Sequence, residues 1–436
     1  MTPSPPHENT DVLVVGAGPT GLAAAIELRR LGIARVVVAD REQQAGGVPR
    51  HCYHIGFGLR DMHRLLTGPR YAQRYVRLAE QAGVEVHTST TVTGWLPDTT
   101  PAARGVSEPA VRGSVSLALT SPRGLSAVHA RAVILATGCR ERPRTARLVP
   151  GDRPLGILTT GALQQLVYIQ HQCIGRRAVV VGAEHVSFSA VLTLAHAGAE
   201  TVAMITEHPR HQTYTPYRWL SATRLRVPIL TSHRITNIIG RRRVEAVEVT
   251  DLATGAVRQL PCDAVVFTGD WIPDHELARR GGLMMDPATR GPCIDGALRT
   301  SAPGVFAAGN LVHAAETADI AALSGRHVAH AVQAFLESDR WPERAPVPIL
   351  CAPPVQWVAP SAIDGDAHRP PQNRFAWRVS EFCGPAELIV RQGGRRLWRR
   401  RYRRLVPTLP LHAPAEWIGQ VDANGEPVTF ELYPAA

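Results

Sequence analysis

The sequence contains no lysine, and all 48 of its basic residues are arginine. The formal net charge of +11 could indicate an acidic partner, but such one-sided arginine usage is more typical of coding bias than of a surface selected for polyanions. No nucleic-acid-binding module is recognisable in the sequence either. We therefore expect no nucleic-acid partner.

Cysteine is also scarce and isolated, with seven cysteines in 436 residues and none in a Cys-x-x-Cys pair. This spacing excludes a dithiol redox pair and the familiar zinc and iron–sulfur motifs, so we expect no metal site. There is no uninterrupted apolar run of about 18 residues, and the polar, proline-rich first ten residues do not look like a secretory signal. We expect a cytoplasmic protein without a membrane span.

The first recognisable motif of the sequence begins with DVLVV at residues 11–15. This short apolar run is typical of a buried parallel strand. Gly16, Gly18 and Gly21 follow in a G-x-G-x-x-G pattern and lead into a helical stretch. The first glycine permits a tight turn, the second lets the backbone approach a pyrophosphate, and the third permits close packing of helix on strand. A second strand then ends at Asp40, placed to accept hydrogen bonds from an adenosine ribose. The pattern predicts a dinucleotide-binding unit, but by itself it does not separate FAD from NAD.

Four later segments resemble the two-dinucleotide-domain flavoproteins, the family of glutathione reductase and thioredoxin reductase. They occur in the family order and are Gly46-Gly47, Ala136-Thr137-Gly138, Thr300 to Asn310, and Thr317-Ala318-Asp319. The resemblance covers roughly residues 10 to 338 and implies that the first loop holds FAD.

By this resemblance, the Gly-Gly loop would run beside the flavin, and residue 310 would bind its ribitol. The family has an acid there, whereas this chain has Asn310, which can both donate and accept hydrogen bonds. The helix that begins near Asp319 would direct its positive end at the flavin N1/O2 edge and stabilise the reduced, anionic flavin. The residues that the resemblance implies for FAD binding are Gly16, Gly18, Pro19, Thr20, Gly21, Asp40, Arg41, Gly46, Gly47, Arg50, Val92, Thr137, Gly138, Gly309, Asn310 and Asp319.

A second apolar strand, RAVVVVG, ends at Gly182. The family would continue with two further glycines, but Glu184 and Ser187 stand at these positions. A carboxylate at the first of them adds negative charge and bulk where two phosphates would approach the backbone, so NAD(P) binding is doubtful. Glu207, at the position of the ribose acid, keeps a working but unusual NAD(P)H site open as the alternative.

The predicted fold class is α/β, with two Rossmann-like dinucleotide-binding domains and a small C-terminal β-rich extension. The FAD domain would be split by an inserted NAD-like domain. The expected boundaries are 8–145 and 276–340 for the two parts of the FAD domain, 146–275 for the NAD(P)-like domain, and 341–436 for a proline-rich linker and the extension.

The arginine-rich segment RRLWRRRYRRLVP follows a Gly393-Gly394 turn and predicts the second strand of a hairpin. Strand alternation would place Trp398 and Tyr402 on one face, and Leu397 together with Arg399 on the other. Two interpretations stay open: a cationic surface that docks a partner, or a solvated hairpin in an arginine-biased chain.

The polar residues that follow the Gly-Gly loop, His51, Cys52 and His54, are the candidate catalytic groups. A histidine near the flavin N5 could take the proton that accompanies hydride transfer, because its pKa lies near working pH. The alternative is a packing role. His313 and Glu316 could face the other end of the ring, or they could cap the next helix.

Residues 46–76 and the segment ATGCRERPR resemble more closely a disulfide-free branch of the same superfamily, with the flavin subunits of opine oxidase and hydrogen cyanide synthase. This resemblance implies an FAD-dependent oxidoreductase, the electron-transferring subunit of a multi-subunit amine, amino-acid or alcohol dehydrogenase. Its partners would be a small electron carrier and a sister dehydrogenase subunit. Many members carry a C-terminal cysteine cluster for a [2Fe-2S] centre, but only Cys351 and Cys383 occur here. The alternatives are a self-sufficient NAD(P)H-dependent flavin reductase and a non-catalytic flavin-binding scaffold.

Overall fold

The computed structural model describes residues 7–96, 115–213, 226–314, 316–342 and 345–435. They form two compact units. Unit 1 combines Met1–Arg50, Ile55–Cys139 and Pro273–Ala436, and unit 2 combines His51–His54 with Arg140–Ile272. The chain thus builds part of unit 1, forms most of unit 2, and returns to unit 1. The fold class is the predicted one, α/β with two Rossmann-like parts and a β-rich C-terminal part.

The first sheet of unit 1 has the strand order β5-β2-β1-β8-β7-β6, and β19 also pairs with β8. Strands β5, β2, β1, β8 and β19 are parallel, whereas β6 and β7 continue the sheet in antiparallel pairing. These strands span β1 His7–Val15, β2 Val36–Ala39, β5 Glu85–His87, β6 Thr91–Trp95, β7 Val115–Ser121, β8 Gly124–Leu135 and β19 Val305–Ala307.

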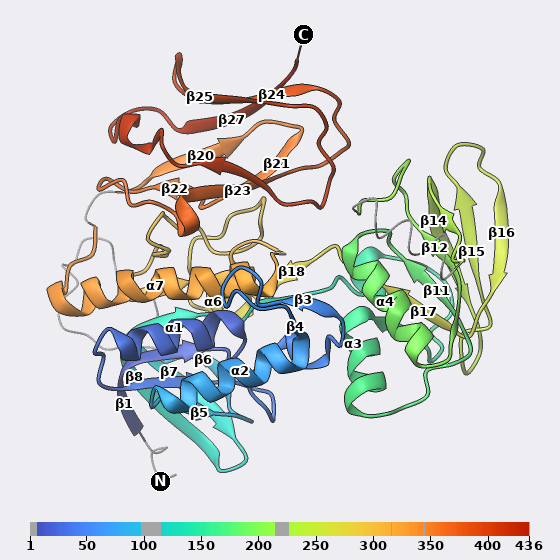
Figure 1. Ribbon diagram of the computed structural model, residues 1–436, viewed down its shortest axis with the longest axis horizontal. Coiled ribbons are helices and arrows are strands. Elements are labelled where there is room, and N and C mark those ends of the chain that lie inside the picture. The colour runs from blue at the N-terminus through green and yellow to red at the C-terminus, as the bar shows by residue number, and fades with distance from the viewer. Residues whose placement is uncertain (1–6, 97–114, 214–225, 315, 343–344, 436) are drawn as a thin grey trace. The chain divides into compact units, whose positions relative to one another are not determined.

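Three helices accompany this sheet: α1 (Pro19–Arg30), α2 (Gly68–Gln81) and α7 (Ala318–Ser338). Figure 1 shows α1 and α7 side by side. Their backbones approach closely at Gly325, where a Cβ would stand 2.1 Å from the Thr20 carbonyl oxygen. None of the described helices is long and apolar enough to cross a membrane.

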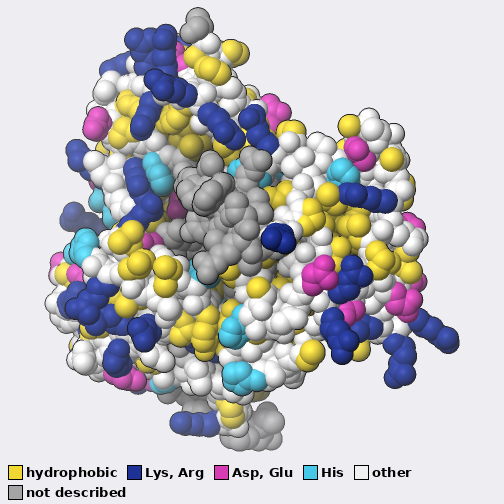
Figure 2. All heavy atoms as spheres, turned by 45° about the vertical axis from the view of Figure 1, so that its right-hand side comes forward, with side chains coloured by type: hydrophobic (Ala, Val, Ile, Leu, Met, Phe, Trp, Pro, Cys, Tyr) yellow, Lys and Arg dark blue, Asp and Glu magenta, His cyan; other side chains and the backbone are white. Residues whose placement is uncertain are grey.

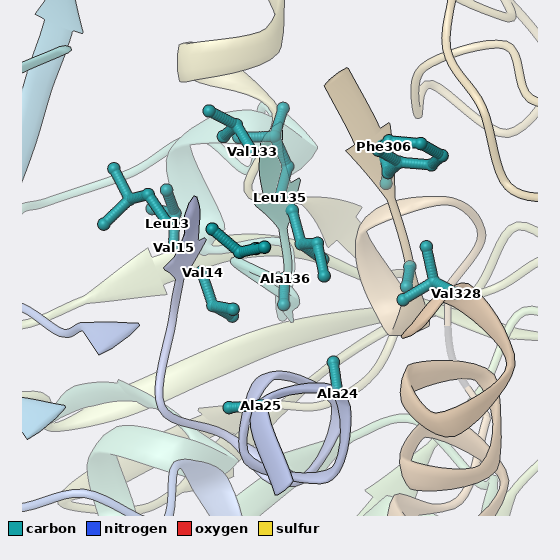
Figure 3. Close-up of a cluster of buried hydrophobic side chains, with 14 of the residues drawn as sticks. Leu13, Val14, Val15, Ala24, Ala25, Val133, Leu135, Ala136, Phe306 and Val328 are labelled. Carbon is teal, nitrogen blue, oxygen red and sulfur yellow. The ribbon is translucent and has the colours of Figure 1, made fainter. Parts of the chain in front are cut away.

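The core of this part of unit 1 is built from the apolar runs that predicted its strands. Val12 to Val14 of β1 are fully buried, because β1 lies between two neighbouring strands and is covered by helices. Figure 3 shows side chains of β1, β8, β19, α1 and α7 in one cluster, with Val14, Leu135 and Val328 among them. This cluster fixes the carboxyl ends of β1 and β8, from which the loops of the candidate site leave.

The smaller elements of unit 1 lie in its connecting segments. They are η1 Val48–His51, which runs into unit 2, with β3 Ile55–Phe57, β4 Leu66–Thr67, α6 Glu276–Arg280 and η7 Gly309–Leu311. The short strands β9 (Cys139–Arg140) and β18 (Ile272–Pro273) mark where the chain passes from one unit to the other.

Unit 2 contains a parallel sheet with the order β10-β17-β11-β12-β13 and an antiparallel sheet β14-β15-β16. Its strands are β10 Ile157–Thr159, β11 Arg177–Val181, β12 Glu200–Ile205, β13 Ile229–Leu230, β14 His233–Ile239, β15 Ala246–Asp251, β16 Val257–Pro261 and β17 Ala264–Phe267. Its helical segments are η4 Arg144–Arg147, α3 Thr160–Gln164, the π-helical turn η5 Gln165–Ile169, and α4 His185–His196. The Rossmann-like arrangement is retained although the second glycine pattern is incomplete.

The C-terminal part of unit 1 is made of two small sheets, with the orders β22-β20-β27-β24-β25 and β21-β23-β26. They enclose an aromatic core in which the ring centroids of Phe375 and Trp417 lie 5.0 Å apart. The elements are β20 Val347–Cys351, β21 Val355–Ala359, β22 Ala362–Ile363, η8 Pro371–Asn373, β23 Arg374–Val379, β24 Ala386–Gln392, β25 Arg395–Tyr402, β26 Leu411–Pro414, η9 Ile418–Gln420 and β27 Val428–Pro434.

The prediction of a proline-rich linker after residue 341 was wrong for the segment 349–371, which forms part of this core. In β21, Val355 and Val358 are buried in this core, whereas Trp357 and Ala359 are buried in the cluster of the first sheet. Most prolines of the segment lie between strands rather than inside them, where proline does not interrupt a hydrogen-bond ladder.

The predicted hairpin is confirmed, with β24 and β25 paired across the Gly393-Gly394 turn. The predicted alternation fails at one point: Val390 pairs with Trp398 and Arg391 with Arg396, so Leu397 is the extra residue of a β-bulge. Leu397 is therefore buried on the core side rather than on the face of Arg399. Figure 2 shows arginine side chains gathered at the end of unit 1 where β25 lies.

Candidate functional site

The first glycine loop joins β1 to α1, and each of its glycines has a separate geometric reason. Gly16 has φ +110°, and a Cβ there would stand 2.5 Å from the Ala136 carbonyl oxygen. A Cβ on Gly21 would stand 1.9 Å from the Gly16 carbonyl oxygen. At Gly18, in contrast, no atom of the described chain lies within 4 Å of a Cβ position. The loop is therefore packed tightly on two sides and leaves free space at the position where a pyrophosphate is expected.

The start of α1 is also free for an anion. Pro19 occupies the first helical turn, the N-cap is Gly18, no side chain of the described residues caps the helix, and no acidic residue lies in its first turn. The exposed N–H groups and the positive end of the helix dipole therefore point into the space beside Gly18. This is the arrangement that a dinucleotide pyrophosphate requires.

The predicted ribose acid, Asp40, lies at the carboxyl end of β2 and is tied to the loop. Its carboxylate accepts hydrogen bonds from the backbone N–H groups of Ala17 and Glu42. These bonds hold it beside the glycine loop, and a carboxylate keeps further lone pairs for hydroxyl donors.

The Gly-Gly loop packs directly on the first glycine loop. Gly46 and Gly47 have φ +119° and +62°, and the Gly46 N–H donates to the Ala17 carbonyl at 2.8 Å. A Cβ on Gly47 would stand 2.8 Å from the Gly18 Cα, so only glycine fits. Arg50 folds back to donate to the Gln44 carbonyl.

The Ala-Thr-Gly turn after β8 is fastened by Asp274, a residue that the sequence analysis did not single out. The Thr137 hydroxyl donates to the Asp274 carbonyl at 2.7 Å, and the Asp274 N–H donates to the Gly138 carbonyl at 2.9 Å. The Asp274 carboxylate also forms an ion pair with Arg41 at 3.2 Å. Asp274 thus joins three of the predicted FAD residues. Its position in the segment PCDAVVFTGDWIPD, which leads back to the FAD domain, was the available signal.

The late motif packs against α1. Gly309 has φ +71°, a Cβ there would stand 2.2 Å from the Thr20 Oγ1, and its N–H donates to the Ser324 hydroxyl at 3.0 Å. The Asn310 amide closes the following loop on both sides: its Nδ2 donates to the Glu316 carbonyl at 3.1 Å, and its Oδ1 accepts from the Glu316 N–H at 2.8 Å. An acid at position 310 could make only the second of these bonds.

Asp319 and Val92 have structural contacts of their own. Asp319 is buried near the start of α7, where its carboxylate accepts from the Ile320 N–H, and from the Arg60 N–H at 3.1 Å. Val92 lies in β6, half-buried against the main core. Whether either also contacts FAD stays a prediction.

The three candidate catalytic residues belong to unit 2. Cys52 is buried, and its thiol contacts the Gln164 Oε1 at 3.3 Å. Burial, with a smaller effect of the Glu141 charge, raises the pKa of Cys52 to about 12, so the sulfur stays a thiol at neutral pH. His51 is also buried, whereas His54 is exposed. These surroundings favour the packing interpretation for Cys52, and a catalytic role for the histidines stays a prediction.

The second glycine loop, in unit 2, differs from the first in the way predicted from its sequence. Glu184 is the N-cap of α4, and it forms a capping box with Ser187. The Ser187 hydroxyl in turn lies 2.6 Å from the Thr268 hydroxyl. The helix end that would face a pyrophosphate is therefore occupied by the chain's own carboxylate.

Two further contacts involve the second glycine loop and its candidate ribose acid. The Gln212 N–H donates to the Ala183 carbonyl at 2.9 Å, so the segment after β12 packs on the loop. Glu207, the candidate ribose acid, forms an exposed ion pair with Arg234 at 2.7 Å. The two loops of the chain thus have opposite properties: one start of a helix is open, and the other is capped by an acid.

The fold and the first loop together define an FAD-dependent oxidoreductase with two dinucleotide-binding domains. Residues 10–334 match the family model described as pyridine nucleotide-disulphide oxidoreductase, and the chain belongs to this family. FAD is its cofactor, and the open space at Gly18 with the uncapped start of α1 fits the group.

Relatives and solved structures agree with this assignment. The chain is 26% identical over 335 residues to an opine oxidase subunit of Rhizobium meliloti, covering 71% of this chain and 60% of that protein. It is 30% identical over 380 residues to the alpha subunit of sarcosine oxidase from Corynebacterium sp. (strain P-1), covering 83% of this chain and 36% of that protein. The structure resembles thioredoxin reductase of T. acidophilum with a TM-score of 0.60 and 20% identity, over 76% of this chain and 100% of that one. The chain thus spans only part of the opine oxidase and sarcosine oxidase proteins, both of which are named as subunits.

Proposed function

We propose that this chain is the electron-transferring flavoprotein subunit of a multi-subunit dehydrogenase that oxidises an amine, an amino acid or an alcohol. The observation that supports this proposal is the contrast between the two glycine loops. The start of α1 is open to a pyrophosphate, whereas Glu184 caps the start of α4 with a carboxylate. Bound at the first loop, FAD supplies the redox chemistry, and a nicotinamide nucleotide is not expected to reduce it.

Under this proposal, the source of the electrons is another protein. The sequence has no Cys-x-x-Cys pair that could relay them as a dithiol. The relatives from opine oxidase and sarcosine oxidase are both named as subunits. We therefore infer that a sister dehydrogenase subunit donates the electrons and that a small electron carrier accepts them.

An anaerobic stopped-flow experiment on the FAD-loaded chain tests the first half of this proposal. NADH or NADPH should leave the visible absorbance of the flavin unchanged over seconds, whereas dithionite, as the control for a competent flavin, should bleach it. Rapid bleaching by micromolar nicotinamide nucleotide would overturn the proposal in favour of a self-sufficient NAD(P)H-dependent flavin reductase.

The second half is tested with the chain co-purified with its partner. Amino acids, secondary amines and alcohols are added in turn, and bleaching should require the chain and the partner together. If the complex holds FAD but no substrate of these classes bleaches it or reduces an added dye, the chain is a flavin-binding scaffold instead.

A further inference from the structure

A cavity of about 60 Å³ lies in unit 1 where the loop after Asn310 and helix α7 meet the C-terminal strands. A buried site needs roughly 10–15 Å³ of such volume for one water, so this cavity takes about four to six water-sized groups. That is the size of a small organic molecule. The polar side chains that line it are those of Asn310, His313, Glu316, Ser324, Gln372, Arg374 and His412.

Glu316 is the unusual member of this lining. It is only 9% exposed, and neither of its carboxylate oxygens accepts a hydrogen bond from any residue that the structure describes. The His412 Nε2 lies 3.6 Å from the Glu316 Oε1, which is too long for a hydrogen bond. Its backbone is fixed by the two bonds to Asn310, so the side chain is held at the cavity wall.

The Glu316 carboxyl is nevertheless charged at neutral pH. Burial raises the pKa of Glu316, but the neighbouring His412 and Arg378 lower it by more, and the net pKa is below the ordinary value. Both carboxylate oxygens keep lone pairs that no described residue fills with a hydrogen bond, so the site is favourable for a ligand that carries donors.

The opposite charge comes from the strands of the C-terminal part. Arg374, at the start of β23, is half-buried, and within the described chain its Nη2 has no hydrogen-bond partner. His412 lies on the adjacent strand β26, and no described residue forms a hydrogen bond with its Nε2. His313 packs against Trp357 with ring centroids 5.0 Å apart, and burial lowers the pKa of His313 to about 4, so its imidazole is neutral. The cavity therefore presents one carboxylate and one guanidinium, each with free hydrogen-bonding capacity.

We propose that this cavity binds a small zwitterion, a molecule with a cationic amine and a carboxylate such as a small α-amino acid. The ammonium would donate to Glu316, and the carboxylate would accept from Arg374. A simple anion would be attracted by the guanidinium of Arg374 but repelled by the carboxylate of Glu316. A simple cationic amine would be attracted by Glu316 but repelled by Arg374. Only a ligand with both charges complements both groups. This site goes beyond the proposed function, because it assigns small-molecule binding to this chain itself and needs no electron transfer.

A metal ion fits the cavity less well. In the described part of the chain, three ligand atoms come within 4.8 Å of one another at Glu8, Glu85 and His87, and again at Asp364, Asp366 and His368. The cavity residues do not form such a group. A small organic ligand is therefore the better occupant.

Isothermal titration calorimetry on the full FAD-loaded chain tests the proposal, with glycine and L-alanine as zwitterions and with acetate and methylammonium as their halves. We expect the better zwitterion to bind at least about tenfold more tightly than either half. Binding of acetate as tight as that of glycine would overturn the proposal. So would the absence of any zwitterion binding at millimolar concentration, which would assign the cavity to water only.

Two variants make the test reciprocal. E316Q should weaken zwitterion binding at least about tenfold and strengthen acetate binding, because the repelling carboxylate is gone. R374Q should also weaken zwitterion binding, but it should strengthen methylammonium binding. E337Q, at an exposed position of the same helix α7, is the matched control and should change none of these affinities. Circular dichroism and flavin absorbance verify that each variant is folded and loaded. If both cavity variants bind every probe as the wild type does, the proposal is wrong.

Discussion

The carboxylate of Glu184 lies directly against the backbone of Gly269, so closely that a Cβ on Gly269 would stand 1.3 Å from the Glu184 Oε1. Gly269 has φ +61° and follows β17, and Glu184 starts α4. Two elements of unit 2 thus enclose a negative charge at the place where related folds hold a pyrophosphate. The lost glycines have been replaced by a specific contact, not only by larger side chains.

This contact leads to a gain-of-function prediction. The double variant E184G/S187G restores the glycine pattern and removes the carboxylate from the helix start. We expect its affinity for NADH or NADPH to rise at least about tenfold, or about 1.4 kcal/mol, as measured by calorimetry. S187G alone keeps the carboxylate and should bind no better than the wild type. Tight NADH binding by the wild type would contradict the whole interpretation.

The open space at Gly18 gives a second prediction. G18A adds a methyl group where no described atom lies within 4 Å, so the apo chain should melt as the wild type does. The same methyl group would occupy pyrophosphate space, and we expect FAD affinity to fall at least about tenfold, measured by titration of the apo chain. G94A is the control, because its Cβ also meets open space but lies in β6. G21A should instead fail to fold stably, because its Cβ would collide with the Gly16 carbonyl. Unchanged FAD binding by G18A would argue against a pyrophosphate there.

The Asn310 amide gives a third prediction: the acid that the family has at this position should destabilise this chain. N310D restores the acid of the family motif, but it removes the donor to the Glu316 carbonyl and places a negative charge beside that oxygen. We expect the apo chain to lose about 1–3 kcal/mol of unfolding free energy, measured by urea denaturation. N9D, at an exposed position, serves as the control. An N310D chain as stable as the wild type would show that the loop does not depend on this bond.

The thiol of Cys52 gives a prediction about pH. Because burial raises the pKa of Cys52 to about 12, its thiolate fraction near pH 8 is on the order of 10⁻⁴, and it grows about tenfold per pH unit up to that pKa. In the native chain, alkylation of Cys52 by iodoacetamide should therefore be at least about a hundredfold slower than alkylation of the exposed Cys173. Peptide mass spectrometry after timed quenching measures both rates. Equal rates near pH 8 would instead support a reactive thiolate and a catalytic role for Cys52.

Local patterns predicted the parts of the site whose geometry is local. The contact that requires glycine at position 21 is with Gly16 in the same loop, so the glycine spacing indicates the strand–loop–helix unit, whereas Gly16 itself packs against the distant Ala136 carbonyl. The hairpin β24–β25 follows for the same reason from two strands and a glycine turn.

Other features depend on contacts between distant residues and could not be read from spacing. Asp274 fastens the turn at Thr137, far away in the sequence, and the cavity is lined both by Glu316 of the loop before α7 and by Arg374 of β23. In a chain with 48 arginines, the sequence gives no signal that distinguishes one arginine as a binding residue. The linker prediction failed because proline content was weighed above the apolar residues of β21, of which Val355 and Trp357 are buried in two different core clusters.

The arginines of β25 have a consequence for self-association. β25 is the last strand of its sheet, so one row of its backbone hydrogen-bonding groups faces outward and could pair with the same strand of a second molecule. Such pairing would bring together the exposed arginines of both molecules, Arg395, Arg396 and Arg399 to Arg401. Glu387 of the adjacent strand forms ion pairs with two of them, Arg399 and Arg401. Like charges placed opposite each other destabilise a strand pair. The arginine row therefore opposes pairing of this exposed strand edge with the same edge of a second molecule.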